Sequence, residues 1–208
     1  MGCVRVAISD LIPPEGLFVS GLCHEGGGTV VLISPDEPGF WPVFVASAEY
    51  ADGQPDPMDR WSKRVIGNWA GRIGGRALFP SDGPPYPAFN RWALASGRFW
   101  QSPVGMLVHR RMGLFASFRG ALILPGHLPL APGTASPCDT CHAPCRTACP
   151  AGAFSPSYDP PACHAFLDLP AGSDCMSQGC HVRRACPISQ DCGRLPKQSA
   201  WHMRQFHT

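Results

Sequence analysis

Cysteine constrains this chain more than any other residue, because eight of the eleven cysteines lie in one carboxy-terminal segment. The first four have the spacing C-x2-C-x3-C-x3-C-P, and the last of the eight is again followed by proline. In a reducing compartment, thiols at this density indicate metal or redox chemistry more than structural disulfides. The eight residues are Cys138, Cys141, Cys145, Cys149, Cys163, Cys175, Cys180 and Cys186.

Two groups of cysteines, each closed by a Cys-Pro pair, predict two 4Fe-4S clusters. The first run is similar to the bacterial ferredoxin run C-x2-C-x2-C-x3-C-P, with one residue more before Cys145. In that ferredoxin run the last cysteine binds the other cluster. The same crossing predicts one cluster on Cys138, Cys141, Cys145 and Cys186, and a second on Cys149, Cys163, Cys175 and Cys180.

Zinc and disulfide bonds are the alternatives for the same cysteines. A C-x2-C pair followed by further Cys and His is also a zinc pattern, and the available histidines are His142, His164 and His181. Tetrahedral zinc, however, requires neither the two Cys-Pro pairs nor the isolated Cys163. Three cysteines remain, Cys3, Cys23 and Cys192, and we expect them to be small buried residues. Cys192 is, however, close enough in sequence to the others to replace one of the predicted ligands.

Composition predicts a globular chain with much irregular backbone. Hydrophobic residues make up 44% of the sequence, which argues against disorder, whereas 24 prolines and 23 glycines favour loops and turns. A length of 208 residues suits one ordinary core and one small appendage. The formal charge of +2, without a run of basic residues, gives no indication of a nucleic-acid partner.

The amino terminus and the hydropathy of the chain predict a cytoplasmic protein. Residues 1–10 lack the long apolar core of a secretory signal. No stretch reaches the roughly 18 apolar residues that a membrane helix requires. We therefore expect no association with a membrane.

Two strands and two helices are predicted in the amino-terminal part. Short β-branched runs at residues 17–22 and 29–33 flank three glycines, which indicates two strands joined by a glycine loop. A phosphate-binding role for this loop would require a following Gly-Lys-Ser/Thr, which is absent. A helix is expected to start at Pro57, and a shorter one covers residues 89–96.

The helix that starts at Pro57 is expected to be capped by Asp56 and to bury one apolar stripe. The stripe recurs every four residues and consists of Trp61, Val65, Trp69 and Ile73. Farther along, residues 114–124 predict a largely buried strand that nevertheless carries Arg119. A buried arginine must be paired or must hold a ligand, because an unpaired guanidinium is costly.

Residues 105–126 resemble the cobalamin-processing (MMACHC, cblC-type) family. The resemblance implies a cofactor pocket lined by Gly105, His109, Gly113 and Arg119, with the arginine near a phosphate, propionamide or thiol and the histidine near the corrin or flavin edge. From the residues alone, a hydrogen-bonded histidine at a turn explains His109 equally well. The matching positions are Gly105, His109, Arg111, Gly113, Arg119, Gly120, Leu124, Pro125 and Gly126.

The cysteine segment is similar to the iron-sulfur tail of epoxyqueuosine reductases and reductive dehalogenases. The shared features are the isolated Cys163 and a Gly-Cys pair, Gly179-Cys180, before the final Cys-Pro. Cys175 would stand in for a cysteine that epoxyqueuosine reductases carry between those two pairs. These families join a cobalamin-binding, nitroreductase-like domain to a two-cluster tail. With a shorter part before its cysteines, the chain also resembles short bacterial ferredoxin-like proteins.

We therefore expect an α+β chain with a nitroreductase-like domain at residues 1–130 and a ferredoxin-like module with two 4Fe-4S clusters at residues 131–208. The first hypothesis is an iron-sulfur electron-transfer protein that serves a redox partner protein or a small-molecule acceptor. The second is a cobalamin-dependent, or less favourably a flavin-dependent, reductase, for which Tyr50, Tyr86 and Tyr158 are candidate proton donors. The third is a zinc-binding or structural cysteine module.

Overall fold

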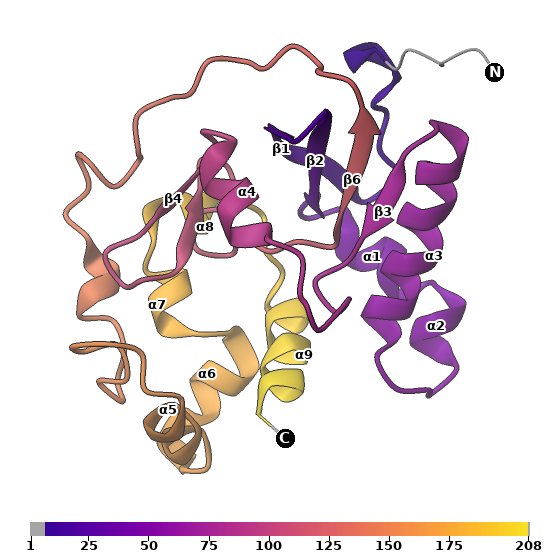
Figure 1. Cartoon of the computed structure of the whole chain (residues 1–208). Coiled ribbons are helices and arrows are strands. Elements are labelled where there is room, and N and C mark those ends of the chain that lie inside the picture. Colours follow the sequence, from indigo (N-terminus) through magenta and orange to yellow (C-terminus); the bar gives the residue numbers. More distant parts are fainter. Residues whose placement is uncertain (1–6, 208) are drawn as a thin grey trace. The chain divides into compact units, whose positions relative to one another are not determined.

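The computed structural model of the chain describes residues 7–207 and divides into two compact units (Figure 1). The first unit comprises the chain up to Arg98 together with Ser117–Thr134, and the second comprises Phe99–Ala116 together with Ala135–Thr208. The chain thus enters the second unit, returns to the first and leaves it again. Cys3 and the first residues of the segment used to predict a cytoplasmic protein lie outside the described residues.

The division into units differs from the predicted boundary in one segment. The sequence analysis assigned everything before residue 131 to the amino-terminal domain. By contacts, Phe99–Ala116 belongs with the cysteine segment, whereas the return to the second unit at Ala135 lies close to the expected boundary. Residues that come before the cysteines in sequence therefore form part of the same compact unit.

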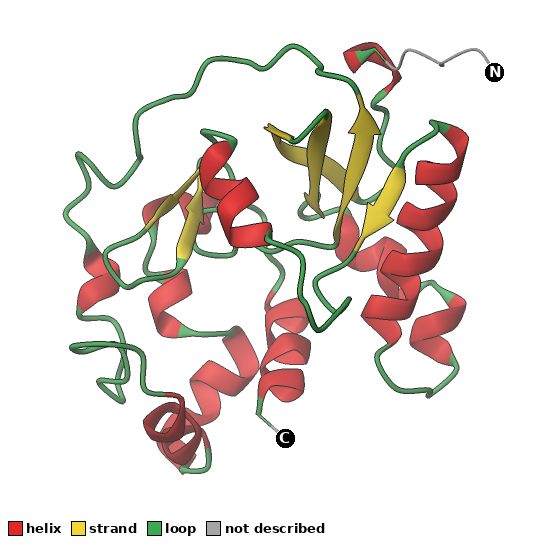
Figure 2. Ribbon diagram, in the orientation of Figure 1, coloured by secondary structure: helices red, strands yellow, loops and turns green. Residues whose placement is uncertain are grey.

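Helices and antiparallel strands are both present, so the predicted α+β class is confirmed at this level (Figure 2). No helix of residues 7–207 has both the length and the apolar character needed to cross a membrane.

A four-stranded antiparallel sheet forms the centre of the first unit, with the strand order β1-β2-β6-β3. β1 (Leu17–Glu25) and β2 (Gly28–Pro35) form a hairpin whose turn contains Gly26 at φ 56°, and the predicted strand-loop-strand is confirmed. β2 is buried along its whole length and also pairs with β6 (Gly120–Pro125). β3 (Arg76–Leu78) pairs with the other side of β6.

Helices flank this sheet, and α3 (Pro57–Arg72) packs against β3 and β6. Both helices predicted for this part are present. The remaining helical elements of the first unit are η1 (Ile8–Asp10), α1 (Phe40–Val45), α2 (Ala48–Ala51) and α4 (Phe89–Ala95).

The buried face of α3 differs from the predicted stripe. A spacing of four residues advances about 40° beyond a full turn at each step, so a four-residue repeat drifts around the helix. Val65 and Ile73 are accordingly only half-buried. The residues that α3 buries are Met58, Trp61, Ser62, Ile66, Trp69 and Ala70.

The predicted capping role of Asp56 is wrong. Its backbone lies in the left-handed region at φ 51°, and its side chain caps no backbone N–H of α3. The helix instead begins with a backbone bond, in which the N–H of Arg60 donates to the carbonyl oxygen of Asp56 at 3.0 Å. Pro57 occupies the first helical position, as expected.

The strand predicted at residues 114–124 is only half correct, because β6 begins at Gly120. Leu114 belongs to the second unit, where its backbone is hydrogen-bonded to the side chains of Ser189 and Arg183. The N–H groups of Phe115 and Ala116 then close turns. Arg119 directly precedes β6, where its N–H donates to Ile33 O at 2.8 Å. It is half-buried, and its Nε donates to Phe118 O at 3.0 Å.

The second unit combines one small hairpin with short helices joined by long loops (Figure 2). β4 (Phe99–Gln101) pairs with β5 (Leu107–His109), and Gly105 at φ 78° lies in the turn between them. The helical elements are η2 (Pro144–Arg146), α5 (Pro160–Leu167), η3 (Pro170–Gly172), α6 (Ser173–Gln178), α7 (His181–Arg184), α8 (Pro187–Asp191) and α9 (Pro196–Phe206).

Candidate functional site

The eight predicted ligand cysteines all lie in the second unit, in loops and at the ends of short helices, and all are free thiols. Loops carry three of them, whereas Cys180 and Cys186 directly precede α7 and α8. The positions are Cys138, Cys141 and Cys149 in loops, Cys145 in η2, Cys163 in α5, Cys175 in α6, and Cys180 and Cys186 at the two helix starts.

Four thiols are here called the first quartet: Cys138, Cys141, Cys145 and Cys186. Burial raises the pKa of Cys145, and the negative charges of Cys138, Cys186 and Cys141 raise it further. Burial also raises the pKa of Cys138, again with Cys186 and Cys141 among the groups that add to the increase. Cys145 and Cys186 are buried in one apolar cluster, against which Cys138 packs.

The second quartet consists of Cys149, Cys163, Cys175 and Cys180. Burial raises the pKa of Cys163, and the charges of Cys180 and Cys149 raise it further. Burial likewise raises the pKa of Cys175, where the charge of Cys180 adds to the effect. Each quartet, defined in this way, contains cysteines from both halves of the segment.

The extra residue before Cys145 is accommodated by a left-handed turn. Ala143 has φ 52°, one of two positive values among the described residues other than glycine. Pro144 then starts η2, which places Cys145 in a buried position. The added residue thus changes the path of the loop without removing Cys145 from the first quartet.

Backbone N–H groups point at sulfur in both quartets. The N–H of Ala143 donates to Cys141 Sγ at 3.4 Å in the first. In the second, a hydrogen bond from the backbone of His181 lowers the pKa of Cys175, against the larger effect of burial. Hydrogen bonds of this kind stabilise thiolates, because they place a positive dipole beside the negative charge.

The start of α8 is held against the segment that follows β5. Cys186 precedes the helix, and Pro187 is its first residue, a position at which proline loses no needed donor. Ser189 Oγ accepts the N–H of Leu114 at 2.8 Å. Gly113, at φ 56°, packs so closely that a Cβ added to it would lie 2.5 Å from the backbone nitrogen of Ser189. Residues of Phe99–Ala116 thus position Cys186.

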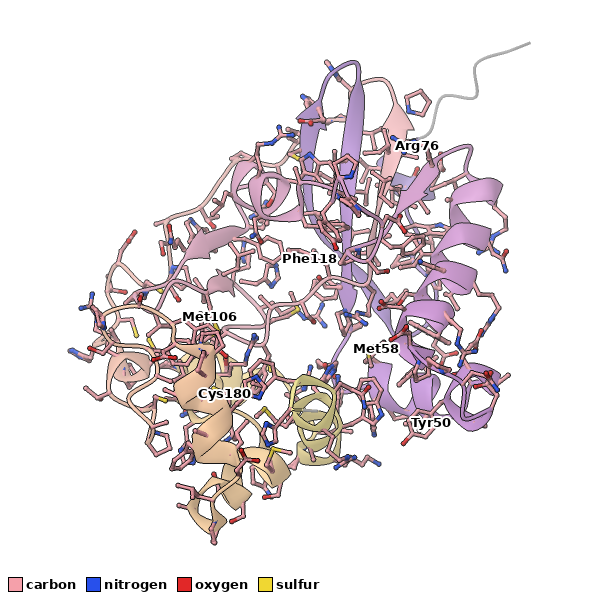
Figure 3. All side chains as sticks on the ribbon, turned by 60° about the horizontal axis from the view of Figure 1, so that its bottom comes forward. Tyr50, Met58, Arg76, Met106, Phe118 and Cys180 are labelled. Carbon is pink, nitrogen blue, oxygen red and sulfur yellow. The ribbon has the colours of Figure 1, made fainter. Side chains whose placement is uncertain are left out.

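One apolar cluster of the second unit contains cysteines of both quartets. Met106 of the β4–β5 hairpin and Cys180, both labelled in Figure 3, pack against its buried members. The buried members are Val108, Leu114, Cys145, Val182 and Cys186, with Trp100, Val104, Met106, Cys138, Ala143, Cys149, Phe154, Cys180 and Ile188 packed around them.

Gly179 explains why glycine precedes Cys180. Its φ is 93°, and an added Cβ would lie 2.8 Å from Cβ of Ser199 on α9. A larger residue would push α9 away from the loop that carries Cys180. The Gly-Cys pair of the sequence therefore reflects a close approach of the backbone to a neighbouring helix.

Two polar side chains of the second unit have shifted pKa values, and of these only Tyr158 was named from the sequence, as a candidate proton donor. Arg183 is half-buried, and one of its N–H groups donates to the carbonyl oxygen of Leu114. Burial lowers the pKa of Arg183, against the charge of Cys180. Burial also raises the pKa of Tyr158 to about 12, and the charge of Cys163 adds to the increase. Arg183 follows Cys180 by three residues, and helical spacing would have placed it on the same face.

The four residues predicted to line a cobalamin pocket are divided between the units. Gly105, His109 and Gly113 belong to the second unit, whereas Arg119 belongs to the first. His109 is buried at a turn, where its Nδ1 accepts the N–H groups of Arg111 and Met112 at 3.2 and 3.3 Å. The two glycines have φ values of 78° and 56°, so turns account for both.

The histidines that could support zinc have other neighbours or are exposed. His164 Nδ1 lies 2.8 Å from His207 Nδ1, His181 Nε2 lies 2.7 Å from Asp174 Oδ2, and His142 is exposed. Within residues 7–207, no three His, Cys, Asp or Glu side chains are arranged so that they could hold one metal ion.

Comparison of the chain with protein-family models, with curated proteins and with solved structures found no match. The functional interpretation therefore depends on the geometry of the two quartets and of the side chains around them.

Proposed function

We propose that the second unit binds two 4Fe-4S clusters and serves as an iron-sulfur electron-transfer module. The observation that carries this proposal is that the eight candidate thiols are free and lie in one compact unit, where Cys145 and Cys186 are buried in one apolar cluster although they are far apart in sequence. Sets of four thiolates are the ligands of such clusters, and paired clusters exchange one ligand between their sequence motifs. In this arrangement Cys149 and Cys186 are the exchanged ligands.

The surroundings of the quartets are compatible with bound 4Fe-4S clusters. Apolar side chains pack around Cys145 and Cys186, and the N–H groups of Ala143 and His181 face sulfur; burial and such hydrogen bonds are two of the means by which proteins set cluster potentials. The absence of a single-ion site in residues 7–207 is compatible, because in a cluster each thiolate binds a different iron atom. When bound, the clusters would supply one-electron storage at the quartets.

The electrons would serve a redox partner protein or a small-molecule acceptor. A nitroreductase-like fold for the first unit, with its antiparallel sheet and flanking helices, is part of the proposal and would provide the surface for such an acceptor. A cytoplasmic location is also part of it, because free thiols persist in reducing compartments.

Metal and sulfide analysis of protein purified without oxygen tests the proposal. We expect about eight iron atoms and about eight sulfides per chain, with a brown colour that bleaches on reduction. Cys145→Ser should lose roughly half of the iron, because one quartet loses a ligand. Cys23→Ser is the matched control, since Cys23 is a buried free thiol of the first unit. Colourless protein that contains zinc would overturn the proposal.

A second candidate, cobalamin-dependent reduction, is supported by the resemblance of residues 105–126. Turns and packing account for Gly105, His109 and Gly113 without a corrinoid, which leaves Arg119 as the position to test. Equilibrium titration with cob(II)alamin should show binding that Arg119→Gln weakens. Absence of any binding leaves the electron-transfer function without a corrinoid acceptor.

A further inference from the structure

The hydroxyl group of Ser102 is buried without a hydrogen-bond partner. Ser102 directly follows β4 in the second unit, and only 6% of the residue is exposed. Within residues 7–207, no atom forms a hydrogen bond with its Oγ. A buried hydroxyl without a partner is costly, and most such groups in folded proteins are paired. This Oγ is therefore a candidate donor to a bound group.

The backbone of Ser102, in contrast, is fully hydrogen-bonded. Its N–H donates to the carbonyl oxygen of Met106 at 2.8 Å, and its own carbonyl oxygen accepts the N–H of Gly105 at 3.0 Å. These two bonds close the turn between β4 and β5 and fix the position of the residue. The turn uses only the backbone, so it does not explain the buried hydroxyl.

The pairing of β4 with β5 determines the face of the hairpin on which the hydroxyl lies. Trp100 is opposite Val108 in the register of the two strands. Two residues farther along, the N–H of Ser102 pairs it with Met106. Opposite residues, and residues two apart along one strand, have their side chains on the same face. Ser102 therefore shares a face with Trp100, Met106 and Val108.

This face of the hairpin packs against cysteines. Val108 is a buried member of the apolar cluster that also contains Cys145 and Cys186. Trp100 and Met106 are packed against the same cluster. The three side chains that share the face of the serine hydroxyl thus all contact the cluster that holds two thiols of the first quartet.

The opposite face of the hairpin has other neighbours. Phe99 and His109 are paired across the strands, and their rings lie 4.5 Å apart. Both residues are buried, and Nδ1 of His109 accepts the N–H groups of Arg111 and Met112. The unpaired hydroxyl thus belongs to the face that packs against the cysteines.

We propose that Ser102 donates a hydrogen bond from Oγ to a sulfur atom of the cluster held by the first quartet. This inference rests on the proposed function. The apolar side chains around Cys145 and Cys186 have no donor to offer to sulfur, whereas a hydroxyl does. Reduction adds negative charge to a cluster, so a donor at its sulfur stabilises the reduced form and raises the midpoint potential.

A redox titration of the purified holoprotein, followed by EPR, tests the inference. Cys138→Ser identifies the EPR signal of the first quartet, because it should alter that signal. Ser102→Ala should lower the midpoint potential of the same signal and leave that of the other signal unchanged. Ser62→Ala is the matched control: Ser62 is also buried, but its Oγ donates to Met58 O at 2.7 Å in the first unit. It should leave both midpoints unchanged.

Two further variants separate the hydrogen bond from packing. Ser102→Thr and Ser102→Val introduce side chains of nearly the same shape, of which only the first keeps a hydroxyl. Ser102→Thr should therefore have a higher midpoint than Ser102→Val. In D2O, deuteron ENDOR of the reduced protein should show one exchangeable coupling that Ser102→Thr retains and Ser102→Val loses. This pair decides the question even if Ser102→Ala fails to fold.

The outcomes separate the inference from the proposed function. Protein without iron contradicts the function itself. Protein that contains both clusters, but in which Ser102→Thr and Ser102→Val have equal midpoints and equal deuteron couplings, keeps the function and overturns the role of Ser102.

Discussion

The two units differ in what occupies their centres. In the first, β2 is buried from end to end and a helix of 16 residues packs on the sheet. In the second, α6, α7 and α8 have only six, four and five residues, and cysteine sulfurs stand among the buried side chains. Helices this short are marginal on their own. The difference indicates that the first unit is stabilised by apolar burial, and we expect the proposed clusters to supply much of the folding free energy of the second.

The largest difference between the two units is expected in their hydrogen exchange after the metal is removed. After chelation and oxidation of the iron, backbone amides of residues 135–208 should exchange rapidly with solvent, because metal binding there supplies folding free energy. The strands β1, β2 and β6 should stay protected. Hydrogen exchange measured by mass spectrometry checks both expectations. Equal protection of the cysteine segment with and without metal would contradict the idea that metal stabilises the second unit.

Truncation in the apolar core should have the converse effect. Trp61 is buried and makes edge contacts with Phe40 and Phe44, so Trp61→Ala should lower the free energy of unfolding of the first unit by about 3–5 kcal/mol. Urea denaturation followed by circular dichroism measures this change. The visible absorption of the clusters should persist. Val65→Ala, at a half-buried site on the same helix, should cost much less.

Glycine substitutions in the second unit should reveal which turn supports the site. Gly113→Ala should cost about 2–4 kcal/mol, because a Cβ at positive φ would also collide with Ser189 beside Cys186. Gly105→Ala is the control: its φ is also positive, but no atom lies within 4 Å of the added Cβ, so about 1–2 kcal/mol is expected. Thermal unfolding, followed by the bleaching of the clusters, compares the stability of the two variants. Equal losses of stability would show that the contact with Ser189 is unimportant.

The smallest effect is expected at an ion pair of the first unit. Arg64 hydrogen-bonds to the nearly buried carboxylate of Glu49 and holds its pKa below the ordinary range. The stabilisation is present at neutral pH and is lost as the pH falls through that lowered pKa. Glu49→Gln should cost about 1 kcal/mol at pH 7 and progressively less in acid. Denaturation curves at several pH values measure this change in the free energy of unfolding. A change that does not depend on pH would show that the charge of Glu49 is not its cause.

Local patterns in the sequence were sufficient for several elements of the first unit. The glycine loop between β1 and β2, the proline at the start of α3 and the short helix near Phe89 are determined by nearby residues, and all were predicted. The error at residues 114–119 arose because the backbone of Leu114 bonds to Ser189 and Arg183, which come about 70 residues later. No local pattern could reveal that partnership.

The sequence selects candidate ligands but says little of their surroundings. Cys-Pro pairs and cysteine spacing predict that Cys149 and Cys186 belong to opposite quartets, because ligand exchange is a general rule for paired clusters. The neighbours of Arg183 and Tyr158 depend on the three-dimensional structure, and the sequence offered a basic pair and three tyrosines without a reason to choose among them.

The crossing of ligands is the central claim, and EPR spectra of four cysteine variants prepared without oxygen test it most directly. In the reduced holoprotein, Cys186→Ser should alter the same cluster signal as Cys138→Ser, and Cys149→Ser should alter the other signal together with Cys163→Ser. If Cys149→Ser and Cys138→Ser instead alter the same signal, the quartets are not crossed and the arrangement of thiols described above does not represent the cluster ligands.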